Sequence, residues 1–149
     1  MFIPKNEPGV FYLFSRLHEK LGFEEIVDVS TLTPDIIAKR RGKPVRIELE
    51  FKSNRAFSHY RVVKEDPREG RWKKDRNIWK FALDDGRISY EIPDPRNDYR
   101  LDKDRGILLH RTAKDKFDII VCWENNGVFE ESVEVIELRK ALAEWGLAI

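Results

Sequence analysis

The sequence has one cysteine, one methionine and no long hydrophobic run. A lone cysteine excludes an intrachain disulfide, and Cys122 lies in an apolar run, where a buried and reduced thiol is expected. No apolar stretch reaches the roughly 18 residues that a membrane span needs, and the N-terminus lacks a basic flank followed by an apolar core. We therefore expect a cytoplasmic protein that does not act at a membrane.

Net charge is also nearly absent, because 28 Lys and Arg stand against 27 Asp and Glu and leave +1. This balance excludes a polyanion binder that works through bulk charge, so only local charged patches remain to be considered. The chain is 149 residues long, with 41% hydrophobic and 37% charged residues. These values predict one globular domain, residues 1–149, rather than a disordered or fibrous chain.

Local patterns predict an α/β fold. Apolar residues recur at helical spacing after Pro8-Gly9, and residues 45–52 alternate strictly between apolar and charged. The expected elements are a helix at 8–21, strands at 25–29, 35–39, 45–52, 117–123 and 132–138, and a closing helix at 139–145. Residues 61–115 show no readable periodicity, and we treat them as an insertion.

The strand predicted at 45–52 is the first candidate site. Its period of two places Glu48, Glu50 and Lys52 on one side. A solvated outer face explains these charges equally well from the strand alone. The preceding strand, however, begins at Pro34-Asp35 and is joined to this one by a short turn, so the hairpin can bring Asp35 beside Glu50 and Lys52.

Two carboxylates in that position suggest a site for a hard divalent cation. Mg²⁺ is commonly held by one or two carboxylates, with waters and phosphate oxygens completing its shell. We expect Asp35 and Glu50 to be metal ligands for Mg²⁺ or Mn²⁺. The bound ion would activate a water molecule, and the Lys52 ammonium would orient the nucleophile and offset developing negative charge.

The same residues carry a resemblance to a known family. Pro34-Asp35, followed on the next predicted strand by Glu50-Phe51-Lys52, resembles the motif of the PD-(D/E)XK nuclease superfamily. The chain is similar, more narrowly, to a group of restriction-endonuclease-like proteins. The motifs shared with that group are Asn6-Glu7, Pro34-Asp35, Glu48-Leu49-Glu50, Ser53, Phe57, His59 and Asp118 to Trp123.

The resemblance implies a restriction-endonuclease-like αβββαβ core, with a mixed central sheet flanked by helices, a helix near 53–60 and a metal-dependent nuclease activity. Related archaeal Holliday-junction resolvases place a glutamate of the first helix in the metal site, so the resemblance adds Glu7 to the catalytic candidates. Its alternative role is an ordinary carboxylate at a helix N-terminus. Glu48 ranks below Glu50, because only Glu50 fits the acidic-x-Lys pattern.

A basic segment indicates nucleic acid as the partner. Between residues 52 and 80 there are ten basic and four acidic residues, a local charge of 10 − 4 = +6. The candidate contacts are Ser53, Arg55, His59, Arg61, Arg71, Lys73 and Lys74. Alternative roles are helix capping for Ser53 and a structural hydrogen bond for His59. Trp72 and Trp79 either stack on unpaired bases or form the core of the insertion.

The expected substrate is DNA, and cutting both strands of a duplex would favour a two-fold homodimer. A different class of function also fits the sequence. In that alternative the basic segment binds nucleic acid without catalysis, and the acidic hairpin is only a charged strand face. The two hypotheses differ in whether a divalent ion and Asp35 are needed.

Overall fold

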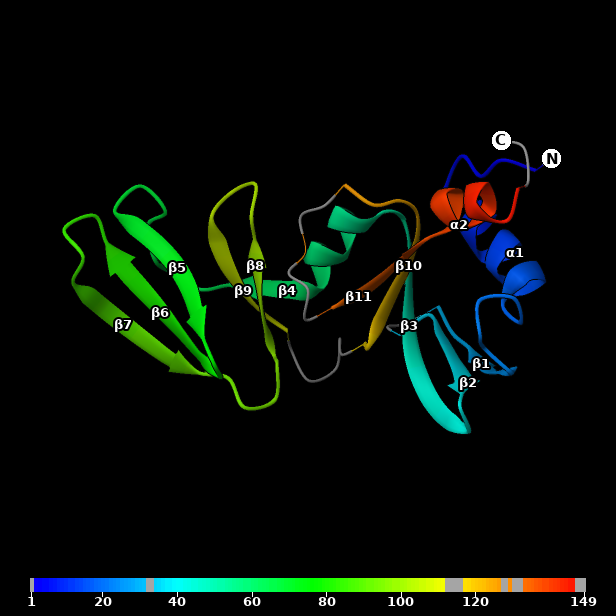
Figure 1. The fold of residues 1–149 in the computed structure, drawn as a ribbon, viewed down its shortest axis with the longest axis horizontal. Coiled ribbons are helices and arrows are strands. Elements are labelled where there is room, and N and C mark those ends of the chain that lie inside the picture. Colours follow the sequence, from blue (N-terminus) through cyan, green and yellow to red (C-terminus); the bar gives the residue numbers. More distant parts are fainter. Residues whose placement is uncertain (1, 32–33, 112–116, 127–128, 130–132, 147–149) are drawn as a thin grey trace.

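The computed structural model describes residues 2–31, 34–111, 117–126, 129 and 133–146. The chain forms an elongated molecule in which a five-stranded sheet with its helices lies at one end and two smaller sheets follow (Figure 1). In chain order the elements are α1 (Glu7–Leu17), β1 (Glu25–Val29), β2 (Ile36–Arg40), β3 (Lys43–Lys52), the 3-10 helix η1 (Ser53–His59), β4 (Tyr60–Val62), β5 (Gly70–Asp75), β6 (Ile78–Leu83), β7 (Ile88–Pro93), β8 (Tyr99–Asp102), β9 (Ile107–Arg111), β10 (Ile119–Glu124), β11 (Glu134–Glu137) and α2 (Leu138–Glu144).

The main sheet is mixed, with the strand order β1-β2-β3-β10-β11. β1, β2 and β3 pair antiparallel, whereas β10 pairs parallel with both β3 and β11. The tight turn between β2 and β3 uses the left-handed conformation at Arg41 and Gly42, with φ of 53° and 75°. β10 lies between two parallel neighbours and is buried along nearly its whole length, which confirms the strand predicted at 117–123.

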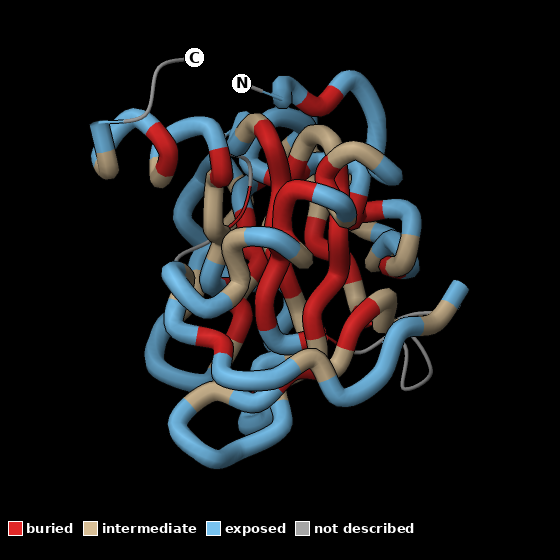
Figure 2. Tube along the Cα trace, turned by 90° about the vertical axis from the view of Figure 1, so that its right-hand side faces the viewer, coloured by how far each residue is buried: buried red, intermediate tan, exposed pale blue. Residues whose placement is uncertain are grey.

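The alternation predicted for β3 directs its apolar residues into one of the two hydrophobic cores that lie on opposite faces of the sheet. Ile47 and Leu49 pack with α1 and α2, through residues such as Phe14 and Leu138. The opposite face of the sheet packs against η1, where Ile120 and Cys122 meet Ala56 and Phe57. Figure 2 shows the buried residues gathered along the central strands. Cys122 is a free, buried thiol, as expected.

The first helix is shorter than predicted. It begins after Asn6, whose Oδ1 accepts a hydrogen bond from the Gly9 N–H at 3.0 Å and caps the helix. It ends at Leu17 rather than at residue 21, because the Phe23 N–H bonds the His18 carbonyl and Gly22 adopts a φ of 94°. The end of the predicted helix is therefore a set of turns that leads into β1.

The insertion consists of two antiparallel three-stranded sheets, β4-β9-β8 and β5-β6-β7; residues 112–115 of the predicted range lie outside the described part of the chain. Trp72 and Trp79 are 5% and 1% exposed and pack with Phe81 and Leu108. Trp79 Nε1 donates to the Asp94 carboxylate at 3.1 Å. The tryptophans are core residues, and stacking on unpaired bases is the wrong interpretation for both.

The chain is thus a mixed α/β protein with a mixed sheet, as expected, although strands dominate its regular structure. The strands at 25–29, 35–39 and 45–52 and the closing helix are confirmed to within a few residues. The helix expected near 53–60 is a 3-10 helix. None of the helices among the described residues is long and apolar enough to cross a membrane.

Candidate metal centre

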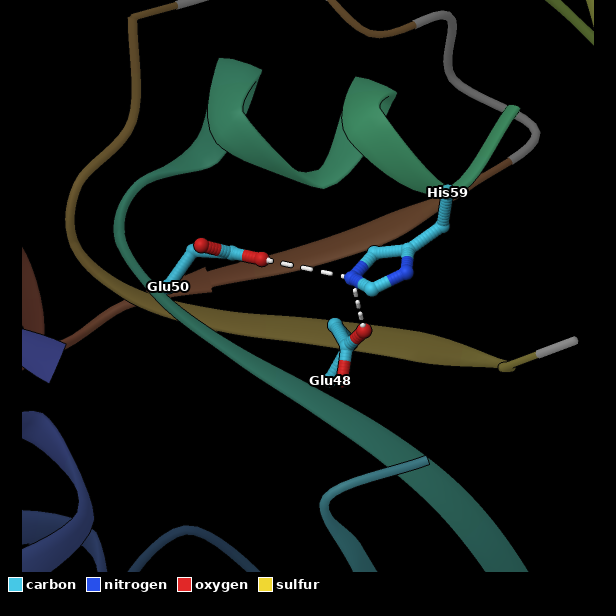
Figure 3. Close-up of side chains that lie close together, drawn as sticks. All are labelled: Glu48, Glu50 and His59. Carbon is cyan, nitrogen blue, oxygen red and sulfur yellow. Dashed lines mark ion pairs between the residues drawn. The ribbon is translucent and has the colours of Figure 1, made fainter. Parts of the chain in front are cut away.

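Glu48, Glu50 and His59 form the centre of a buried acidic cluster. The two glutamates lie on the face of β3 that is turned toward η1, and His59 at the end of η1 points back between them (Figure 3). His59 Nε2 lies 2.7 Å from Glu48 Oε2 and 3.9 Å from Glu50 Oε1. One ligand atom of each residue lies within 4.8 Å of the others, which is close enough to share one metal ion.

Asp35 joins this cluster from the start of β2. Antiparallel pairing sets Ile36 opposite Ile47, so the residue before β2 lies level with the middle of β3. Asp35 Oδ2 accepts a hydrogen bond from the Leu49 N–H at 2.9 Å, which fixes the carboxylate. Its other contact is a side-chain hydrogen bond with Glu48. The expected approach of Asp35 to the acidic face of β3 is therefore present.

Glu7 reaches the same place from the first turn of α1. Together with Asp35 and Glu50 it lines an open cavity of about 730 Å³. The remaining lining residues are Thr31, Asn54, Arg55, Phe57, Ser58, His59 and Arg105. The cavity is therefore lined by carboxylates together with cationic and polar groups.

The carboxylates perturb one another strongly. Burial, the hydrogen bond with Glu48 and the charges of Glu48 and Glu7 raise the pKa of Asp35 to about 8, against a smaller lowering by the Leu49 N–H. Burial and the charges of Glu7 and Glu48 raise the pKa of Glu50 to about 7, although His59 and Arg55 act in the opposite direction. Burial is also the main cause that raises the pKa of Glu7. Without a cation the cluster therefore holds protons near neutral pH.

Four of the residues singled out in the sequence meet in this cluster: Glu7, Asp35, Glu50 and His59. Glu48 belongs to it as well, although the acidic-x-Lys pattern ranked it lower. The signal that identifies Glu48 is the period of two, which places it on the same face as Glu50. Lys52 lies at the end of β3 opposite Glu124, and it is not among the described residues that line the cavity. Its catalytic role stays a prediction.

Ser53 is fully buried and does not fit the expected contact with nucleic acid. Its Oγ lies 2.9 Å from Asn125 Oδ1 and 2.6 Å from Asn126 Oδ1, and it accepts a hydrogen bond from the Asn126 N–H. Lys52 stands at the N-cap of η1, so Ser53 does not cap that helix either. Ser53 instead holds η1 against the segment that follows β10.

The other expected nucleic-acid contacts are spread over two regions. Arg55 lines the acidic cavity, while Arg61 is exposed on β4. Arg71 and Lys73 are exposed on one face of β5. Lys74 lies on the opposite face, where its Nζ donates to Asn97 Oδ1 at 2.8 Å and lies 5.5 Å from the Trp79 ring centroid. Lys74 therefore supports the insertion rather than presenting a free charge.

Comparisons with protein-family models, curated proteins and solved structures found no match. The resemblance to the PD-(D/E)XK superfamily accordingly rests on the sequence motifs alone.

Proposed function

We propose that the protein is a divalent-metal-dependent nuclease that hydrolyses phosphodiester bonds of nucleic acid, with DNA as the expected substrate. The observation that carries this proposal is the cavity that Glu7, Asp35 and Glu50 line together with Arg55 and His59. Such a cavity offers ligands for a cation and donors for a phosphate side by side. Without a cation, the carboxylates would repel the phosphate of the substrate wherever they are ionised.

The donor set fits a hard or borderline divalent ion. Asp35, Glu48 and Glu50 offer carboxylate oxygens, which suit Mg²⁺ and Mn²⁺, and the imidazole of His59 adds a nitrogen that Mg²⁺ accepts less readily. The raised pKa values of Asp35 and Glu50 mean that positive charge, from protons or a metal ion, stabilises this cluster. When bound, the ion would polarise a phosphoryl oxygen and lower the pKa of a bound water.

The protein's own residues would position the substrate. The Arg55 guanidinium, held 5.7 Å from the Phe51 ring centroid, lies where it can donate to phosphate oxygens at the mouth of the cavity. Glu48 holds the His59 ring by its 2.7 Å contact and so fixes the direction in which the imidazole faces the cavity. Lys52 shares a face of β3 with Glu50, as the motif requires, and its role in orienting the nucleophile is part of the proposal.

The order of the elements supports the nuclease over a module that only binds. The main sheet and its helices have the αβββαβ order that the resemblance implies: α1, β1, β2, β3, η1 and, after the insertion, β10. A 3-10 helix stands in place of the second helix. Fold order alone does not fix a function. A module that only binds nucleic acid, however, gives no reason to bury carboxylates beside its phosphate-binding groups.

A cleavage assay tests this proposal. Wild type, Asp35→Asn and the exposed control Glu144→Gln would be incubated with fluorescent single-stranded, duplex, flap and four-way-junction DNA, in EDTA, Mg²⁺ or Mn²⁺. We expect wild type and Glu144→Gln to cut only with metal, and Asp35→Asn to lose about 100-fold or more. Metal-independent binding that is equal in all three proteins, with no cutting, would establish the binding module instead.

A further inference from the structure

A second cavity, of about 380 Å³, lies next to the metal centre. It is formed by the beginning of β5 and by the turn between β8 and β9, and Figure 1 shows the β8–β9 hairpin standing between β5 and η1. Arg105, in that turn, lines both this cavity and the acidic one. The two cavities are therefore neighbours that share one cationic side chain.

The second cavity is positively charged. Arg71, Lys103 and Arg105 line it against a single carboxylate, Asp104. Two of these cations are oriented by contacts within the chain. Arg71 Nη1 donates to the carbonyl oxygens of Pro67 and Gly70 at 3.0 and 2.9 Å, and Arg105 Nε donates to the carboxylate of Asp102. A guanidinium has five N–H donors, so each remains able to bind an anion.

Trp72 also lines the second cavity. Its side chain is 5% exposed, and its indole N–H has no hydrogen-bond partner within the described ranges of the chain. The ring packs against Phe81, with centroids 5.1 Å apart, and lies edge-on to Tyr90. A ring so enclosed has no free face for stacking on a base, and its N–H is buried, so Trp72 only shapes the wall of the cavity.

We propose that this second cavity binds a backbone phosphate of the nucleic acid, next along the strand from the phosphate at the metal centre. This inference rests on the proposed function, because its purpose is to guide the strand that is cut. Arg71 and Lys103 supply the donors, and Arg105 links the two phosphates. The insertion thereby becomes part of the substrate-binding surface.

Equilibrium binding of a fluorescein-labelled single-stranded DNA oligonucleotide, followed by anisotropy in EDTA, tests the cavity without cleavage. We expect Arg71→Ala to weaken binding about 10-fold and to reduce the slope of log affinity against log salt by about 0.7. Arg96→Ala is the control, because Arg96 is an exposed cation of the insertion that does not line the cavity.

Unchanged affinity in Arg71→Ala would overturn the inference. Arg71 is exposed, so its replacement does not disturb a hydrophobic core. An equal loss in Arg71→Ala and Arg96→Ala would overturn it too, since that result shows general charge rather than a site. Hydrolysis of bis(p-nitrophenyl) phosphate with Mn²⁺ separates the two proposals. This small diester needs only the metal centre, so its hydrolysis should be the same in wild type and Arg71→Ala. If neither wild type nor Arg71→Ala hydrolyses this diester, the proposed nuclease function is contradicted. The DNA-binding measurements still show whether the second cavity binds a phosphate.

Discussion

Replacing Glu50 by glutamine should stabilise the metal-free protein above neutral pH. Glu50 is 6% exposed, and its surroundings raise its pKa from 4.5 to about 7, so the ionised carboxylate is less stable in the folded than in the unfolded chain. One pKa unit corresponds to about 1.4 kcal/mol, which gives about 3 kcal/mol at pH 8 for this group alone. The pKa of Glu50 is higher in the folded than in the unfolded chain, so the free energy of unfolding has its full value below about pH 4.5. It declines as the pH rises to about 7 and stays lower above that pH.

Urea or thermal unfolding in EDTA measures this effect. At pH 8 we expect Glu50→Gln to unfold with about 1–3 kcal/mol more free energy than wild type, or about 2–10 °C higher in Tm. At pH 5 the difference should fall below about 1 kcal/mol. Glu144→Gln, on the exposed side of α2, should differ from wild type by less than about 0.5 kcal/mol at either pH. A Glu50→Gln variant that is no more stable than wild type at pH 8 would refute the reasoning.

Two further predictions follow from the same structure. Binding of Mn²⁺ should tighten as the pH rises from about 6 to 8, because the raised pKa values of Glu50 and Asp35 mean that the metal displaces protons; calorimetry in buffers of different ionisation enthalpy measures the protons released, and pH-independent binding would contradict this. Gly70→Ala should destabilise the insertion by about 3 kcal/mol or more, since a Cβ there would lie 2.3 Å from the Ala82 carbonyl oxygen; a urea-unfolding midpoint equal to that of wild type would contradict this.

The acidic face could be predicted because a strand has a simple period. Once β3 was identified from its alternation, Glu48 and Glu50 had to share a side, and the short turn at Arg41 and Gly42 had to return Asp35 to them. The residue that completes the cluster, His59, depends on the geometry of η1. A 3-10 helix has three residues per turn, and the helix near 53–60 was expected only from the family resemblance, so the placement of its side chains could not be predicted.

The insertion could not be predicted for a different reason. Its strands are short, and their register is set by turns such as the one at Arg76, where a non-glycine residue adopts a φ of 57°. Such turns carry no regular hydrophobic pattern. The side chains that fill the core, Trp72, Trp79 and Phe81, alternate with charged or small residues over stretches of only six. Sequence alone therefore left it open whether Trp72 and Trp79 form the core of the insertion or stack on unpaired bases.

The pairing of β4 with β9 has a consequence for how the chain folds. Tyr60 lies opposite Arg111, so the entrance and the exit of the insertion are adjacent. β3 and β10, which carry and support the acidic cluster, are far apart in sequence yet pair directly. Closing such a long loop costs conformational entropy and slows folding. Because β4 pairs with β9, the two ends of the insertion are held close together. The effective loop between β3 and β10 is then short, so these two strands can pair at a smaller entropic cost.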